Sequence, residues 1–290
     1  MPELPEVEVV RRGLAPAVTG AQIAHVEVVD ARSLKRHDAR RGDFVGMLEQ
    51  AQINSVERRG KFMWMTLSTG DALVVHLGMS GQVLLREPGA DDDRHVRIRL
   101  DVSTAAHGDL VVTFVDQRIF GSMAVDALVE QHGALVPSQV AHIALDPLDE
   151  RFDDDAFVAA LRRKRTGIKR ALLDQTLVSG IGNIYADEAL WASRLHYDRP
   201  TERVTPAQAR TVLAEVRAVL RKALAEGGTS FDAQYVNVNG QAGYFSHSLN
   251  AYGRQGEACS RCGVPIVRES FMNRGSHFCP VCQRRPRARL

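Results

Sequence analysis

The four cysteines of this 290-residue chain constrain its fold more than any other feature, because all of them lie in one short stretch. They form two CxxC pairs, Cys259 with Cys262 and Cys279 with Cys282, and sixteen residues separate the pairs. Two such pairs can supply four thiolates in a tetrahedron, with each pair on a tight turn. Because sulfur fills all four positions, we expect one Zn²⁺ ion with a structural rather than a catalytic role.

Two disulfides are the alternative for these cysteines, and they fit poorly a chain without an export signal. The first twenty residues carry charged side chains where a signal peptide would need an apolar core. No apolar run approaches the length of a membrane span either, so we expect a cytoplasmic protein. The zinc would brace a β-hairpin whose tip, at residues 273–275, presents the cation of Arg274.

Charge is distributed unevenly along the chain, although the formal net charge is only +2. Basic residues cluster at 162–165 with 169–170, and again at 284–289. Each run alone is typical of a solvated face or a tail. Two runs that flank further motifs favour a stripe that binds nucleic-acid phosphates. With 44% apolar residues, a chain of this length can form two domains with cores of their own.

The apolar pattern changes along the chain. Residues 2–18 predict a helix with one apolar side. From about 22 to 125, short apolar runs punctuated by glycines predict the strands of a β-sandwich or barrel-like domain. Beyond a predicted hinge at 132–152 the period is helical, and the composition of residues 229–250 indicates a loop. The expected strands are 23–29, 53–58, 62–67, 72–77, 96–100 and 110–115, and the expected helices are 154–163, 169–177, 183–192 and 206–225.

The N-terminal sequence MPELPE places a secondary amine beside two carboxylates. Once the initiator methionine is removed, Pro2 carries a free amine with a pKa near 8, of which roughly a tenth is neutral at pH 7. Such an amine can attack an electrophilic carbon while Glu3 or Glu6 protonates the leaving group. Its adduct with a sugar aldehyde carbon can only be an iminium cation. The alternative is that Pro2 and Pro5 merely open a helix, with glutamates at the positive end of its dipole.

Two further segments fit contacts with a phosphate backbone. In residues 180–186, two glycines come directly before an expected helix, so backbone N–H groups and the helix dipole could face a phosphate. A glycine turn of this kind more often only caps or turns. Lys61 stands at a turn before an expected strand, and an ordinary surface lysine is the alternative reading.

Three side chains at turns are candidates for entering a DNA duplex. Met79 lies between two glycines, where a methionine can act as an apolar wedge rather than as core filler. Arg118 pairs a cation with the aromatic Phe120 two residues on, although Phe120 also fits an ordinary core. The residues around His95 do not by themselves indicate a function for it, and a histidine at a strand edge is the simpler interpretation.

Six segments together resemble the formamidopyrimidine-DNA glycosylase family of oxidised-base repair enzymes. They are PELPEVE at the start, RRGK, HLGMSG, RIFG, SGIGNIYADE and the terminal CxxC…NRGSHFCPVC. The resemblance covers essentially the whole chain, and the N-terminal and zinc-ribbon signatures seldom occur together elsewhere. It implies an α+β fold: an N-terminal β-sandwich domain with flanking helices, and a C-terminal helix–two-turn–helix domain with a zinc ribbon. DNA would bind in the cleft between them.

The resemblance also implies a bifunctional DNA glycosylase and AP lyase that removes oxidised purines, such as 8-oxoguanine and formamidopyrimidines, in base excision repair. By motif match, Pro2 is the Schiff-base nucleophile and Glu3 its acid partner, with Glu6 in support. Lys61 matches the lysine that assists β-elimination and contacts phosphate. Arg274 matches the residue that acts in the second elimination, the δ-elimination.

The DNA contacts follow from the same motif match. Met79, Arg118 and Phe120, called the insertion trio below, resemble the residues that fill the void left by an extruded nucleotide. One position departs from the family: Ile119 stands where a second arginine is frequent, so the contact from that arginine is absent. The residues that match phosphate-binding positions are His95, Lys164, Asn183, Tyr185 and Arg274.

The implied partner is damaged double-stranded DNA, bound by a monomer in the bacterial cytoplasm near the nucleoid. An endonuclease VIII-like glycosylase for oxidised pyrimidines is one alternative, and Leu4 favours the purine-directed branch over it. A non-catalytic damaged-DNA-binding protein and a zinc-ribbon transcription accessory are two others, and both leave the N-terminal motifs unexplained. The expected parts are a catalytic domain 2–131, a hinge 132–152, a helix–two-turn–helix domain 153–228, a lesion-contacting loop 229–249, a zinc ribbon 250–284 and a basic tail 285–290.

Overall fold

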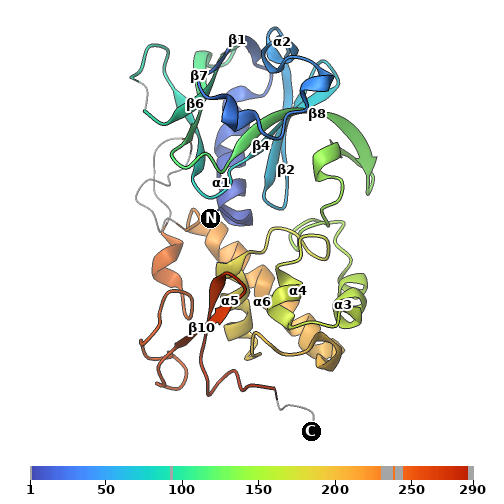
Figure 1. Cartoon of the computed structure of the whole chain (residues 1–290), viewed down its shortest axis with the longest axis vertical. Coiled ribbons are helices and arrows are strands. Elements are labelled where there is room, and N and C mark those ends of the chain that lie inside the picture. The colour runs from blue at the N-terminus through green and yellow to red at the C-terminus, as the bar shows by residue number, and fades with distance from the viewer. Residues whose placement is uncertain (1, 92–93, 230–237, 239–243, 287–290) are drawn as a thin grey trace. The chain divides into compact units, whose positions relative to one another are not determined.

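The computed structural model describes residues 2–91, 94–229, 238 and 244–286 (Figure 1). By its internal contacts the chain divides into two units. The first consists of residues 1–142 with 227–243, and the second of residues 143–226 with 244–290. The segment that begins at Gly227 therefore belongs to the first unit, although it follows the helices of the second in sequence.

Two antiparallel sheets form the body of the first unit (Figure 1). Its elements are α1 (Leu4–Val18), β1 (Gln22–Val28), η1 (Ala31–Leu34), η2 (Ala39–Arg41), α2 (Phe44–Leu48), β2 (Ile53–Arg59), β3 (Phe62–Leu67), β4 (Asp71–His76), β5 (Gly81–Arg86), β6 (Val96–Thr104), β7 (Gly108–Asp116), β8 (Ser122–Gln131), β9 (Ala134–Pro137) and η3 (Ser138–Val140). One sheet has the order β1-β6-β7-β5 and the other β2-β3-β4-β8-β9. A single core draws buried residues from both sheets and from α1, among them Leu14, Met63 and Phe114. The predicted β-sandwich is confirmed.

Helix α1 closes this core on one side. It begins at Leu4, and Glu3 is its N-cap. Pro5 lies in the first turn, where backbone N–H groups have no partner within the helix, so the N–H that proline lacks costs no helical hydrogen bond. Val7, Val10 and Leu14 recur at helical spacing, and all three are buried. The N-terminal residues are thus the start of a helix anchored in the core, rather than a loose chain end.

Glu8 lies on α1 at the centre of a cluster of arginines. Its carboxylate accepts hydrogen bonds from Arg11 at 2.8 and 2.9 Å, from Arg12 at 2.8 Å and from Arg58 on β2 at 3.0 Å. Burial alone would raise the pKa of this carboxyl, but the hydrogen bonds and charges of Arg11 and Arg58 lower the pKa of Glu8 to about 2. Arg58 also donates to the carbonyl of Gly60 at 3.0 Å, so the cluster joins α1 to the β2–β3 turn.

The second unit contains the helices and a two-stranded hairpin. Its elements are α3 (Asp154–Arg163), α4 (Ile168–Leu172), α5 (Asn183–Ala192), η4 (Thr201–Arg203), α6 (Pro206–Ala225), η5 (Phe245–Ser248), β10 (Val267–Phe271) and β11 (Arg274–Phe278). Helix α6 begins with a capping box, in which Thr205 and Gln208 each accept a hydrogen bond from the other's backbone N–H. Among the described residues, no helix combines the length and the apolar character that crossing a membrane requires.

The structure adds three strands that the sequence pattern does not predict, β5, β8 and β9. Strand β9 lies inside the predicted hinge, because residues 134–137 pair with β8. The helix expected at 169–177 is wrong in length, since α4 ends at Leu172 and the Asp174 side chain accepts the backbone N–H of Thr176 in a turn. Most of the loop predicted at 229–250 lies outside the described residues.

The Glu8 cluster yields a prediction about the stability of the first unit. A carboxyl with a pKa lowered from 4.5 to about 2 in the folded state contributes about 3 kcal/mol above pH 4.5, and this contribution is lost as the pH falls through about 2. Glu8→Gln should therefore lower the free energy of unfolding by about 3 kcal/mol at pH 7, measured by denaturant titration. The difference from the parent should shrink between pH 4.5 and pH 2.

Glu130→Gln is the control for this prediction, because Glu130 is exposed on β8. It should change the unfolding free energy by less than about 0.5 kcal/mol. A Glu8→Gln deficit that stays constant down to pH 2 would contradict the assignment of the stability to this carboxylate.

Candidate active site and zinc site

The N-terminal residues are buried where α1 begins. Pro2 is buried, and Glu3 and Glu6 are each only 2% exposed. The backbone N–H of Glu3 donates to Oε2 of Glu6 at 2.8 Å. This hydrogen bond fixes the peptide unit that directly follows the proline ring, so the position of Pro2 depends on Glu6.

The second oxygen of Glu6 contacts a residue that lies 223 positions away in sequence. Its Oε1 accepts the backbone N–H and the hydroxyl of Thr229, each at 2.8 Å. Gly228, with φ of +83°, passes so close that a Cβ there would lie 3.2 Å from the same oxygen. Sequence reasoning does not identify Thr229, and the only signal near it is the glycine pair at 227–228.

A second described contact joins α1 to the segment after Thr229. Val238 is buried, and its carbonyl accepts the N–H of Leu85 at 3.1 Å. A Cβ on Gly13 of α1 would lie 2.4 Å from Cγ2 of Val238, so only glycine allows this approach. The remaining residues of the predicted lesion-contacting loop, 230–237 and 239–243, lie outside the described residues.

Lys61 lies in the turn between β2 and β3, partly exposed. Gly60 before it has φ of +57°, a left-handed conformation that glycine adopts without cost. Since Arg58 donates to the Gly60 carbonyl and also to Glu8 on α1, the lysine turn is tied to the helix that begins beside Pro2. The structure thus places Lys61, Pro2 and Glu3 in one unit, where Arg58 joins the β2–β3 turn to α1.

His76 ends β4 and is the first residue of the HLGMSG segment, but the sequence assigns no role to this histidine. Burial lowers the pKa of His76 to about 4, and the positive charges of Arg36, Lys61 and Lys35 act in the same direction. The imidazole is therefore neutral at physiological pH. Its Nδ1 accepts the backbone N–H of Gly78 at 3.2 Å, which leaves the ring proton on Nε2.

The insertion trio occupies two neighbouring segments of the first unit. Met79 and Phe120 are each 42% exposed, although large apolar side chains are normally buried. The guanidinium carbon of Arg118 lies 4.5 Å from the ring centroid of Phe120, a cation–π contact. Between them Ile119 adopts φ of 54°, and Lys35 donates to its carbonyl at 2.8 Å.

His95 lies directly before β6 and is partly exposed. Its Nε2 accepts Nε of Arg94 at 3.0 Å, and its carbonyl accepts the backbone N–H of Asp116 at 2.9 Å. The residue is thus fixed beside the end of β7, close in structure to the segment that begins at Asp116.

A buried ion pair supports the hairpin of the second unit. Nζ of Lys169 lies 2.7 Å from Oδ1 of Asp187, and both side chains are almost fully buried. Lys169 also donates to the Gly275 carbonyl at 3.2 Å and to the Ser276 hydroxyl at 2.7 Å. Arg274, one residue earlier, is exposed at the start of β11. Because Lys169 is buried, it does not belong to the basic surface stripe that the sequence suggested.

Lys164 and Asn183 take different places in the second unit. Lys164 follows α3 with its side chain 40% exposed, and its Nζ lies 2.6 Å from Oδ2 of Asp174. Asn183 begins α5, and its Nδ2 donates to the carbonyl of Gly275 at 3.1 Å. Asn183 is thus connected to the turn that carries Arg274, whereas Lys164 pairs with a carboxylate at the surface.

Tyr185 is fully buried on α5. Its ring stacks on Phe245 of η5, with ring centroids 5.7 Å apart. The expectation that this side chain contacts a phosphate needs correction, because no part of it is exposed. Its aromatic ring packs α5 against η5 and so supports the start of the helix that Asn183 begins.

The four cysteines meet at the base of the β10–β11 hairpin, and their sulfur atoms all lie within 4.8 Å of one another. The sulfurs of Cys262 and Cys279 are 3.4 Å apart, close to the about 3.8 Å of a tetrahedron with Zn–S bonds of about 2.3 Å. Burial and the neighbouring thiols of Cys262 and Cys279 raise the pKa of Cys282 to about 12. The donor set fits one structural Zn²⁺, as predicted.

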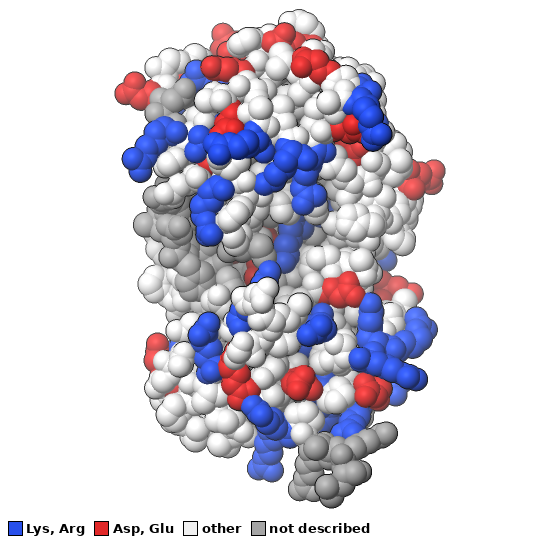
Figure 2. Space-filling view, in the orientation of Figure 1, with Lys and Arg blue, Asp and Glu red and all other residues white. Residues whose placement is uncertain are grey.

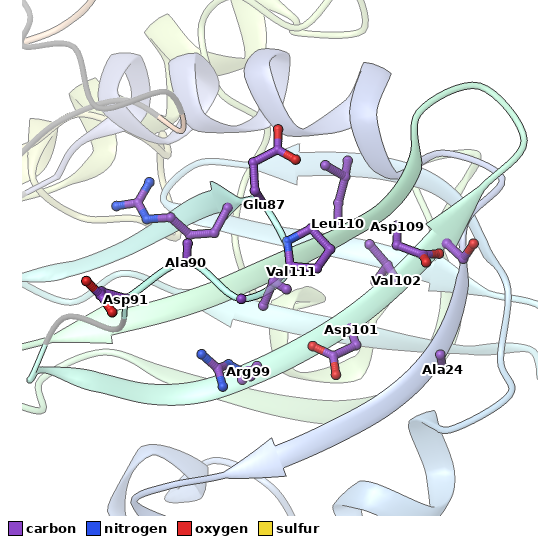
Figure 3. A pocket seen from close by; sticks show the side chains of 14 residues that line it. Ala24, Glu87, Ala90, Asp91, Arg99, Asp101, Val102, Asp109, Leu110 and Val111 are labelled. Atoms are coloured by element: carbon purple, nitrogen blue, oxygen red, sulfur yellow. The ribbon is translucent and has the colours of Figure 1, made fainter.

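Figure 2 shows basic side chains on the surface of each unit, with acidic side chains interspersed among them. A cavity of about 580 Å³ opens elsewhere, on the outer side of the β1-β6-β7-β5 sheet (Figure 3). Arg99 and Asp101 of β6 line it, together with Glu87, Asp91 and Asp109. A cavity with this many carboxylates does not fit a phosphate backbone, so it is separate from the candidate active site.

Three family descriptions match consecutive parts of the chain. Residues 1–123 match the N-terminal domain of formamidopyrimidine-DNA glycosylase, and residues 143–234 match its helix–two-turn–helix domain. Residues 256–285 match a zinc finger found in this glycosylase and in isoleucyl-tRNA synthetase. The chain belongs to the formamidopyrimidine-DNA glycosylase family. It is a DNA glycosylase with AP lyase activity that removes oxidised purines in base excision repair.

Full-length relatives support this membership. A formamidopyrimidine-DNA glycosylase of Leifsonia xyli is 63% identical, with 98% of this chain and 100% of the relative covered. One from Thermobifida fusca is 56% identical, with 99% of each covered. The Lactococcus lactis enzyme in complex with formamidopyrimidine-containing DNA is 30% identical, with a TM-score of 0.82 and 98% and 100% coverage. Its complex with abasic-site DNA gives the same identity, TM-score and coverage.

The zinc site predicts the effect of losing one ligand. Cys279→Ala should release the single zinc ion per chain, measured by atomic absorption, because three thiolates no longer close the tetrahedron. The unfolding transition of the second unit should move to lower temperature, since metal binding contributes to the folding free energy. Ser260→Ala, an exposed position between two ligands, is the control and should retain the metal. Full zinc content in Cys279→Ala would contradict the four-cysteine site.

Proposed function

We propose that the catalytic amine is the nitrogen of Pro2, exposed as a chain end once Met1 is removed. The observation that carries this proposal is the hydrogen bond of 2.8 Å from the Glu3 N–H to the buried Glu6 carboxylate. An ordinary chain terminus frays, and a frayed amine cannot be aimed at one carbon atom. Here the peptide after the proline is fixed within the core of the first unit, as a nucleophile requires.

The chemistry follows from the amine and its neighbours. Pro2 attacks C1′ of the damaged nucleotide while Glu3 supplies the proton that the reaction needs, and the base departs. The C1′–O4′ bond of the sugar then breaks and O4′ takes up a proton, which turns this adduct into an iminium cation. The iminium acidifies the adjacent sugar proton, so β-elimination can follow. Lys61 assists that step from the β2–β3 turn and contacts a phosphate. Arg274 acts in the δ-elimination, which leaves a one-nucleotide gap with phosphates at both ends.

Damaged double-stranded DNA is the proposed partner, as the two Lactococcus lactis complexes contain damaged DNA. A base inside a duplex hides C1′, so the nucleotide must be extruded at a cost of a few kcal/mol. The exposed insertion trio would offset this cost by filling the void. His95, Lys164, Asn183 and Arg274 would bind backbone phosphates, with Lys164 exchanging Asp174 for a phosphate.

The proposed division of labour keeps the parts expected from the sequence. Residues 2–131 would carry the catalytic chemistry, and residues 153–228 with the zinc ribbon at 250–284 would bind DNA. The segment at 229–249 would contact the lesion, with Thr229 tying its start to Glu6. We propose that the enzyme acts as a monomer in the cytoplasm, where its DNA substrate lies.

Borohydride trapping tests the proposed nucleophile. The parent protein, with Met1 removed, should form a covalent adduct with an abasic duplex when borohydride reduces the iminium. Pro2→Gly should form much less adduct, because a primary amine in place of the ring nitrogen loses both the fixed position and the obligatory iminium. Mass spectrometry of the reduced product should locate the DNA on residue 2.

Lys61→Ala separates the nucleophile from the elimination step. It should still be trapped, yet strand cleavage at an abasic site should slow by about 10²- to 10⁴-fold, the usual contribution of a positioned acid–base group. DNA attached to a lysine side chain in the parent protein, or an undiminished adduct in Pro2→Gly, would sink the proposed mechanism.

Salt dependence tests the phosphate contacts. Each neutralised phosphate contributes about −0.9 to the slope of log affinity against log salt concentration. Lys164→Gln should therefore make this slope shallower by about 0.9, measured by fluorescence anisotropy on a duplex with a stable abasic analogue. Lys222→Gln is the matched control, since Lys222 is an exposed lysine on α6 that also faces a carboxylate, that of Glu226. An unchanged slope in Lys164→Gln would remove this residue from the DNA contacts.

A further inference from the structure

Asp116 is a fully buried carboxylate at the end of β7, and none of the roles above belongs to it. Its Oδ1 accepts the hydroxyl of Ser80 at 2.5 Å and the backbone N–H of Arg118 at 3.1 Å. Its Oδ2 accepts the backbone N–H of Gly121 at 2.7 Å. A buried carboxylate is costly unless donors satisfy it, so these bonds constrain the positions of all three donors.

The three donors come from the two segments that carry the insertion trio. Ser80 lies in the β4–β5 turn, one residue after Met79. Arg118 and Gly121 lie between β7 and β8, on either side of Phe120. The buried side chain of Asp116 therefore connects both segments. Its donors are a member of the trio, Arg118, and residues directly next to the other two members.

The same two segments touch backbone to backbone. A Cβ on Gly78, which has φ of +63°, would lie 2.4 Å from the carbonyl carbon of Phe120. A Cβ on Gly121 would lie 2.7 Å from the carbonyl oxygen of His76. Neither glycine leaves room for a side chain, so the β4–β5 turn and the β7–β8 segment are in direct backbone contact.

Backbone strain gives independent evidence that the β7–β8 segment is fixed. Ile119 has φ of 54°, a left-handed conformation that is unfavourable for a β-branched residue. Such a conformation persists only where the surrounding contacts over-determine it. Asp116 accepts the N–H groups of Arg118 and Gly121 on either side, and Lys35 donates to the Ile119 carbonyl itself at 2.8 Å.

We propose that Asp116 is a positioning residue that makes the insertion trio one preformed wedge. The inference rests on the proposed function, because it assumes that the trio enters the duplex. Side chains on two independent loops would have to be ordered as the nucleotide leaves the stack, and that loss of freedom would oppose extrusion. Segments already joined through Asp116 avoid this loss. Because Asp116 is buried, it acts through the two segments and not on DNA.

Asp116→Asn tests the proposal. The amide keeps the shape of the side chain but replaces one accepting oxygen with an NH₂ group, which cannot accept an N–H such as that of Gly121. Base removal from a duplex containing 8-oxoguanine should slow by about tenfold or more. Cleavage at an abasic site in a single-stranded oligonucleotide has no void to fill and should change by less than about twofold. The readout is the ratio of the duplex rate constant to the single-strand rate constant.

Asp126→Asn is the matched control. Asp126 is also buried in the first unit, and it accepts the Ser138 hydroxyl at 2.8 Å and the Gln139 N–H at 2.7 Å, away from the trio. Its variant should lose comparable folding stability, yet keep the duplex to single-strand ratio of the parent. An equal fall of the ratio in both variants, or an unchanged ratio in Asp116→Asn, would overturn the inference.

Two more variants keep the outcome decisive. Ser80→Ala removes one donor and leaves the carboxylate in place, so the duplex to single-strand ratio should fall by roughly threefold. If Asp116→Asn does not fold, the Ser80→Ala ratio tests the proposal in its place. Met79→Ala tests the wedge itself. An unchanged ratio in Met79→Ala would mean that the insertion role of the proposed function is wrong. A lowered ratio in Met79→Ala alone would mean that only the role of Asp116 is wrong.

Discussion

A carboxylate that leaves water must be met by donors, and this requirement organises the functional parts of both units. In the first unit Glu6, Glu8 and Asp116 are buried, and each connects segments that are distant in sequence. In the second unit the buried Asp187 pairs with Lys169 and accepts the backbone N–H of His277 in β11. Each of these contacts lies within a few residues of a group with a proposed chemical role. The donors that each buried carboxylate requires thus hold the neighbouring groups in defined positions.

The four buried carboxylates accept from different kinds of donor, and the kind of donor determines which part of the structure each one constrains. Glu6 and Asp116 accept mainly backbone N–H and hydroxyl groups, so they specify the path of the main chain at Glu3, Thr229 and Gly121. Glu8 accepts guanidinium groups, and Asp187 pairs with an ammonium group. These ion pairs join elements rather than shape loops: Glu8 joins α1 to β2, and Asp187 joins α5 to α4. Asp187 also holds the zinc hairpin through the backbone N–H of His277. The zinc constrains the base of that hairpin, while Lys169 constrains its other end through Gly275 and Ser276. A hairpin fixed at both ends can present Arg274 in one orientation.

The sequence predicts what is local and misses what is distant. The CxxC spacing predicts the zinc site, and helices 154–163, 183–192 and 206–225 are confirmed to the residue, because caps and periodicity are local signals. The contact of Glu6 with Thr229 spans 223 positions, and no single-sequence pattern encodes it. Strand β9 lies within the predicted hinge, and it forms by pairing with β8, which the sequence pattern does not predict either. Tyr185 and Lys169 show the limit of motif and charge patterns, since both fit a DNA-facing surface in sequence and both are buried in the structure.

Ile119 shows how strongly the fold determines the wedge. The family resemblance leads us to expect an arginine at this position, and the chain carries a β-branched residue that disfavours the left-handed conformation it adopts. The backbone conformation therefore does not come from residue 119. It comes from the groups on either side, where the N–H groups of Arg118 and Gly121 donate to Asp116, and from Lys35, which donates to the Ile119 carbonyl. A side chain can then change at this position while the backbone that carries Arg118 and Phe120 keeps its path.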